Sequence, residues 1–142
     1  MKLYADEPDH ALVRGLAAVV VSALARVEVP GALWRKQRLG QLSPEDAGLL
    51  ALAFEADFHG SGAEAPRFAA VAITTPILDA AAELVAVHPL RTYDAVQLAC
   101  ALAARAADPE CGDFACFDGT LRHAAAGRGF RVLPSFRASL AG

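Results

Sequence analysis

The stretch of sequence that decides the fold covers residues 114–133 and reads FACFDGTLRHAAAGRGFRVL. An apolar run, FACF, precedes a single acid, Asp118, and a helix-forming segment follows over residues 119–127 before a second apolar run over residues 130–133. A strand, a helix and a strand in this order predict parallel strands joined by a helix. Ligands of such sheets bind at the carboxyl ends of the strands, and Asp118 falls at one of these ends.

The same alternation of strands and helices extends back over most of the chain. Ser43 and Pro44 mark the clearest helix start, with a serine N-cap and a proline at the first position. Thr92 is predicted as the N-cap of a later helix, and Pro30 is expected to bend an earlier one. The predicted strands are residues 19–22, 68–73, 114–117 and 130–133, and the predicted helices are residues 8–18, 23–38, 44–59, 75–88, 93–106 and 119–127. This order predicts an α/β fold with a parallel β-sheet wrapped by helices.

Length and composition favour a single cytoplasmic domain over residues 1–142. The chain is 55% apolar, and a domain of 142 residues can bury a core without disulfides. Its net charge of −3 argues against binding nucleic acid through bulk positive charge. The three cysteines are an odd number and the N-terminus, MKLYADEPDH, is polar, which predicts a reducing cytoplasm. No apolar run is long enough to span a bilayer, so no membrane association is expected.

Three acids, Glu28, Asp94 and Asp118, stand out because each is flanked by apolar residues. A carboxylate in apolar surroundings is unfavourable unless it is paired or bound to a metal. Each acid also has a purely structural interpretation. The helix dipole would stabilise the negative charge of Asp94 near the N-terminus of its helix. Asp118 would cap the following helix, and Glu28 would pair with an arginine. The candidate arginine partners of Glu28 are Arg26, Arg35 and Arg91.

Taken together, three acids at the ends of neighbouring α/β elements favour a convergent site. Carboxylates held close together repel each other, and a divalent cation cancels that repulsion. Oxygen ligands suit Mg²⁺ or Mn²⁺ rather than zinc. Such an ion activates water and stabilises charge on a phosphate, so hydrolysis of phosphodiesters is the predicted chemistry.

Four segments, in this order along the chain, resemble the VapC-type toxins of the PIN-domain family. KLYADEPDHALVR resembles the early part of these toxins, and VSALARVEVPGALWR resembles the segment that carries their conserved glutamate. LRTYDAVQLACALA resembles the segment with an aspartate at the start of a late helix. FACFDGTLRHAAAGRGFRVL resembles their closing strand, aspartate, helix and strand. The similarity spans nearly the whole chain.

The resemblance implies a PIN-like fold, a five-stranded parallel sheet with helices on both sides. It further implies a Mg²⁺- or Mn²⁺-dependent endoribonuclease, a hydrolase held inactive by a cognate VapB-like antitoxin, and it suggests a homodimer. By match, Glu28, Asp94 and Asp118 are the metal-binding or water-orienting acids. Arg91 and Arg122 are then expected to contact RNA phosphate, the antitoxin or the acids themselves.

The sequence also departs from the family pattern. The family opens with a central strand and an aspartate before the KLY segment, and neither precedes Met1 here. We therefore expect that Met1 is an internal valine codon read as an initiator and that the natural chain begins upstream. Cys116 stands where threonine or serine is common, and Pro30 replaces a helix-compatible residue. Because the first aspartate is missing, a non-catalytic PIN-like module that binds RNA or a partner is the alternative function.

Other interpretations have less support. The spacing of Cys111, Cys116 and His123 is not a usual zinc pattern, and a nucleophilic pair of Cys116 with His123 requires a cysteine that the sequence places in a strand. A phosphoacceptor receiver domain needs a late lysine, whereas Lys2 and Lys36 are the only lysines. Five phenylalanines are predicted to be core residues rather than stacking platforms for bases, namely Phe58, Phe68, Phe114, Phe117 and Phe130.

Overall fold

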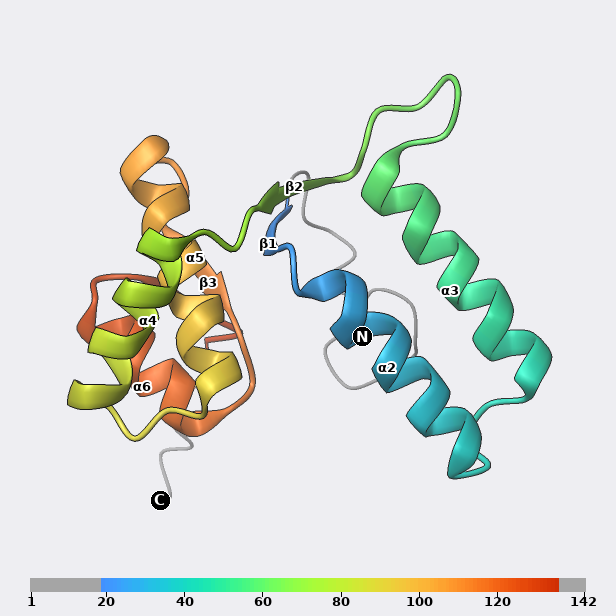
Figure 1. Cartoon of the computed structure of the whole chain (residues 1–142), viewed down its shortest axis with the longest axis horizontal. Helices are drawn as coiled ribbons and strands as arrows, with labels where there is room; N and C mark the ends of the chain where they lie inside the picture. Colours follow the sequence, from blue (N-terminus) through green and yellow to red (C-terminus); the bar gives the residue numbers. More distant parts are fainter. Residues whose placement is uncertain (1–18, 136–142) are drawn as a thin grey trace, which may run out of the picture. The chain divides into compact units, whose positions relative to one another are not determined.

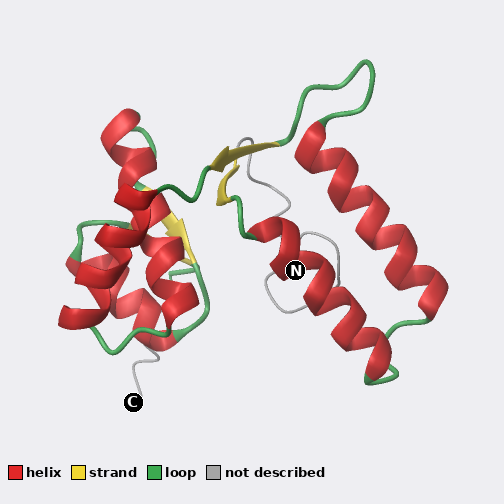
Figure 2. Ribbon diagram, in the orientation of Figure 1, coloured by secondary structure: helices red, strands yellow, loops and turns green. Residues whose placement is uncertain are grey.

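The computed structural model describes residues 19–135, which belong to two compact units, Met1–Ala72 and Ile73–Gly142 (Figure 1). Helices make up most of each unit and the strands are short (Figure 2). The helix predicted over residues 8–18 and the strand expected before Met1 lie outside the described residues. None of the helices in the described part of the chain is long and apolar enough to cross a membrane.

In the first unit, two parallel strands are joined by a pair of helices. β1 (Val19–Ser22) pairs with β2 (Phe68–Val71), and α2 (Ala25–Arg38) packs against α3 (Pro44–His59). Leu33, Ala47 and Phe54 form the buried centre, and the Phe54 ring contacts two further phenylalanines, Phe58 and Phe68.

Local sequence explains where the helices of the first unit begin and how they run. The predicted N-cap at Ser43 is confirmed, because its Oγ accepts a hydrogen bond from the Asp46 N–H at 3.0 Å. Pro30 lies inside α2, which continues past it to Arg38. Proline has no N–H to donate, so the ladder of backbone hydrogen bonds in α2 has a gap at this position.

The second unit contains the stretch that decides the fold. α4 (Thr75–Val87) packs against α5 (Thr92–Ala107), and β3 (Asp113–Ala115) is joined by α6 (Gly119–Gly127) to β4 (Arg131–Leu133). β3 and β4 are parallel, as predicted, and Ala115 lies opposite Leu133 at their carboxyl ends. The buried core is supplied by the helices and by Phe130, and its members are Ile77, Ala81, Leu84, Ala95, Val96, Leu98, Ala99, Cys100, Leu121, Ala124, Ala125 and Phe130.

The prediction of an α/β fold with parallel strands is confirmed, but the sheet is smaller than predicted. Among residues 19–135 the strands form two separate two-stranded sheets, β1 with β2 and β3 with β4. Each of these strands therefore has one hydrogen-bonded edge within the described part of the chain.

Two local predictions are wrong. The N-cap of α5 is Arg91 rather than Thr92, because the Arg91 carbonyl already accepts a hydrogen bond from the Ala95 N–H at 3.0 Å. Phe117 is not a core residue, since its side chain is 39% exposed. β3 ends at Ala115, two residues before the predicted end, so Phe117 lies in the connection to α6 rather than on the strand.

Candidate functional site

Asp118 lies between the end of β3 and the start of α6, at the carboxyl edge of the β3–β4 sheet. Its backbone is extended, and its Oδ1 accepts a hydrogen bond from the Leu121 N–H at 2.9 Å. The structural interpretation of Asp118 as an N-cap is therefore confirmed. This bond fixes one carboxylate oxygen, and Oδ2 has no hydrogen bond to any other residue among 19–135.

Asp94 lies in the first turn of α5 and is half-buried beside the core residue Ala95. Burial raises the pKa of the Asp94 carboxyl group, and the negative charge of Asp118 raises it further. The positive charge of Arg91 acts in the opposite direction. The two carboxylates, which the sequence separates by a helix and a strand, thus lie near enough in the second unit for one charge to act on the other.

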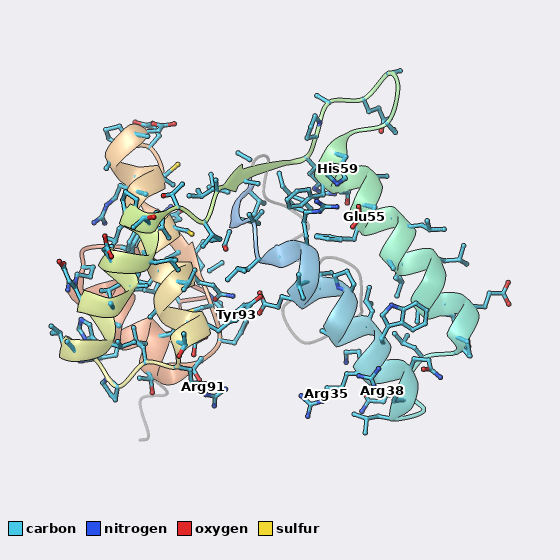
Figure 3. All side chains as sticks on the ribbon, viewed as in Figure 1. Arg35, Arg38, Glu55, His59, Arg91 and Tyr93 are labelled. Atoms are coloured by element: carbon cyan, nitrogen blue, oxygen red, sulfur yellow. The ribbon has the colours of Figure 1, made fainter. Side chains whose placement is uncertain are left out.

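Arg91 lies near Asp94, as its position in the sequence predicts. It is exposed at the N-cap of α5, and its side chain projects with that of Tyr93 from the start of this helix (Figure 3). Its positive charge lowers the pKa of Asp94, but by less than burial and Asp118 raise it.

Cys116 lies on the same edge, two residues before Asp118. Burial raises the pKa of the Cys116 thiol to about 11, the charge of Arg122 offsets part of this increase, and the charges of Asp118 and Asp94 add to it. The thiol is therefore neutral near pH 7. A neutral thiol is a poor nucleophile, because nucleophilic attack needs the thiolate.

The side chain of Arg122 forms hydrogen bonds with the backbone at this edge. Its guanidinium donates hydrogen bonds to the carbonyl oxygens of Cys116 at 2.8 Å, Leu133 at 3.1 Å and Pro134 at 2.7 Å. This role could not be predicted from a local pattern, because the three acceptors lie 6 to 12 residues away along the chain. A contact of Arg122 with RNA or an antitoxin stays a prediction.

Glu28 lies in the first turn of α2, in the other unit, and is exposed. Its neighbours in the sequence are apolar, but this stretch of α2 faces outward, and the neighbouring Val27 is itself 72% exposed. The convergence of Glu28 with Asp94 and Asp118 stays a prediction.

A second cluster of charged groups was not predicted. Glu55 and His59 lie one turn apart on α3 (Figure 3), with 3.3 Å between the Glu55 carboxylate and His59 Nε2. Arg26 of α2 lies 3.6 Å from the same carboxylate, and its guanidinium lies 5.7 Å from the centre of the Phe58 ring. Arg26 is thus an ion-pair partner of Glu55 and links α2 to α3.

Within the described residues, no group of three or more histidine, cysteine, aspartate or glutamate side chains is arranged to hold a metal ion. Asp94 and Asp118 form a pair, and carboxylate oxygens are the donors that Mg²⁺ and Mn²⁺ prefer.

Comparison with known proteins gave no match: no family model fits the chain, and no curated protein is significantly similar to it.

Proposed function

We propose that this chain is a metal-dependent endoribonuclease with a PIN-like fold, the toxin of a VapBC-type toxin–antitoxin system. Asp94 and Asp118 would hold Mg²⁺ or Mn²⁺, with Glu28 as the third acid. The observation that carries the proposal is that Asp118, at the carboxyl edge of β3 and β4, lies near enough to Asp94 for its charge to act on that carboxyl group. Sites of α/β proteins occur at this edge, and the two acids come from different elements, the starts of α5 and α6.

The acidic pair suits a divalent cation. Burial raises the pKa of Asp94 and the charge of Asp118 raises it further, so a bound cation would stabilise the pair in its ionised form. Asp118 keeps Oδ2 for an ion while Oδ1 caps α6. The pair offers carboxylate oxygens as donors, which favours Mg²⁺ or Mn²⁺ over zinc. When bound, the ion would supply charge stabilisation at the phosphate and activation of water.

Residues around the pair would orient the RNA. Arg91 is an exposed cation beside Asp94 and would attract a phosphate of the RNA backbone. Phe117 is 39% exposed directly before Asp118, and an exposed aromatic ring offers a face on which an unpaired base stacks. Both residues flank the acids, so backbone and base contacts would be made next to the bond that is cleaved.

The remaining parts of the proposal rest on the resemblance of the sequence to VapC-type toxins. They are a VapB-like antitoxin as the partner, RNA as the substrate, a homodimer as the assembly and the cytoplasm as the compartment. The two parallel strand pairs, each associated with helices, are compatible with a PIN-like sheet.

The test is cleavage of a labelled, random-sequence oligoribonucleotide by the purified chain with Mg²⁺, with Mn²⁺ and with EDTA. We expect cleavage only with metal, and loss of cleavage in Asp94→Asn. Glu83→Gln is the matched control, because Glu83 is an exposed acid on α4. Binding of RNA without metal-dependent cleavage would overturn the nuclease and favour the non-catalytic binding module.

A further inference from the structure

We infer that Arg122 is a positioning residue that fixes the backbone around Asp118 and thereby sets where the Asp118 carboxylate lies. The inference rests on the proposed function in one respect, that Asp118 is an acid of the active site. Its structural part stands on the hydrogen bonds of Arg122 alone.

Arg122 holds the chain on both sides of Phe117. Its backbone N–H donates to the Asp118 carbonyl at 2.9 Å, as the first full turn of α6 requires, and its guanidinium donates to the Cys116 carbonyl at 2.8 Å. The Asp118 side chain is fixed in turn by the Leu121 N–H at 2.9 Å. Residues 116–118 are therefore anchored at the carbonyl before Phe117, at the carbonyl after it and at the carboxylate.

The guanidinium also joins the two strand ends. Leu133 O accepts the Cys116 N–H at 3.1 Å, the last backbone bond between the two segments, and it also accepts from Arg122 at 3.1 Å. Pro134 O, one residue beyond β4, accepts from the same guanidinium at 2.7 Å. Arg122 thus continues the β3–β4 ladder past its end and gives the Cys116 and Pro134 carbonyls a donor there.

An arginine is suited to this position and a lysine is not. A guanidinium is planar and presents several N–H groups in a fixed fork, so one side chain can serve three carbonyls from two segments. A lysine keeps the positive charge, but its compact ammonium group lacks this fork. The substitution Arg122→Lys therefore removes the geometry while retaining the positive charge near Cys116.

The other end of the same strands provides a matched control. Arg131, the first residue of β4, forms a two-pronged ion pair with Asp113, the first residue of β3. This pair also links β3 to β4, but it lies at the amino ends of the strands and is exposed. Arg131→Gln removes a link between the strands without touching the edge that carries Asp118.

The experiment measures amide hydrogen exchange by NMR in the metal-free protein. In Arg122→Lys we expect the Cys116 and Leu121 amides to exchange roughly three- to tenfold faster, the effect of losing one to two ordinary hydrogen bonds. In Arg131→Gln the Leu121 amide should keep its wild-type rate. Wild-type exchange rates at both amides in Arg122→Lys would overturn the inference.

Two further measurements keep the inference testable. If Arg122→Lys does not fold, amide exchange in the wild-type chain is the test. A Leu121 amide that exchanges as fast as the Thr120 amide would show that the Asp118 carboxylate is not fixed. Calorimetric titration with Mn²⁺ should show weaker binding in Arg122→Lys than in Arg131→Gln. If the wild-type chain neither binds Mn²⁺ nor cleaves RNA, the proposed function fails, whereas the exchange rates still decide the role of Arg122.

Discussion

The carboxylates of Asp94 and Asp118 lie close enough for the charge of Asp118 to raise the pKa of Asp94, although the two residues begin different helices. Asp94 comes from the first turn of α5 and Asp118 is the N-cap of α6. Both helix starts favour negative charge through the helix dipole, which helps to accommodate two acids at one edge.

Replacement of Asp94 by asparagine should change the pH dependence of stability. The folded state holds the Asp94 proton to a higher pH than the unfolded state, whose value is near 3.8. The contribution of this group to stability therefore falls as the pH rises from 3.8 through the raised value. Asp94→Asn removes this fall, so its melting temperature relative to the wild type should increase across that window. Melting curves between pH 3 and pH 7 measure the difference, and a constant offset would argue against the raised pKa.

Two substitutions at Asp118 should separate helix capping from metal binding. Asparagine keeps a side-chain oxygen that can accept the Leu121 N–H, whereas alanine does not. Asp118→Ala should lose about 1 kcal/mol of stability and Asp118→Asn only a small fraction of it. Both should lose metal-dependent RNA cleavage, because both lose the charge. An active Asp118→Asn would leave Asp118 with the capping role alone.

Metal binding should be visible without any RNA. If Mn²⁺ binds only the folded chain, an excess of one hundredfold over Kd stabilises that chain by about 2.7 kcal/mol and raises its melting temperature. Glu28→Gln should reduce this shift if Glu28 is the third acid. Glu83→Gln, on the exposed face of α4, should leave the shift unchanged. A shift that is equal in Glu28→Gln and in the wild type removes Glu28 from the site.

Much of the secondary structure could be predicted because its signals are local. Ser43 and Asp118 each lie three residues before the N–H that they accept, so both helix starts can be identified within a few residues of sequence. Apolar runs on either side of α6 identified β3 and β4 and their parallel order. The error at Phe117 is of the same local kind, since an apolar residue just past a strand cannot be told from the last residue of that strand.

The site could be predicted only in part because its decisive contacts join distant residues. The nearness of Asp94 to Asp118 follows from their shared position at helix starts in neighbouring elements. The hydrogen bonds of Arg122 with the Leu133 and Pro134 carbonyls depend on where β4 ends, which no short pattern in the sequence indicates. The pairing of Arg26 with Glu55 likewise depends on how α2 and α3 pack.

The reactivity of Cys116 offers a chemical test of the site geometry that needs neither metal nor RNA. Alkylation requires the thiolate, and the pKa of Cys116 is raised from 9.0 to about 11 by burial and by the neighbouring acids, with an opposing effect of Arg122. At pH 8 the thiolate fraction, and with it the alkylation rate, should be about a hundredfold lower in the folded chain than in the unfolded chain. Iodoacetamide labelling followed by mass spectrometry of the Cys116 peptide measures both rates and distinguishes this thiol from Cys111.

The effect of the acids on this thiol can be isolated by substitution. Asp118→Asn removes one negative charge beside Cys116 and should increase its alkylation rate at pH 8. Asp113→Asn removes an acid from β3 that does not contribute to the raised pKa of the thiol, so it should leave the rate unchanged. Equal rates in the two variants would mean that Asp118 does not lie beside Cys116, and the acidic edge from which the nuclease is proposed would lose its support.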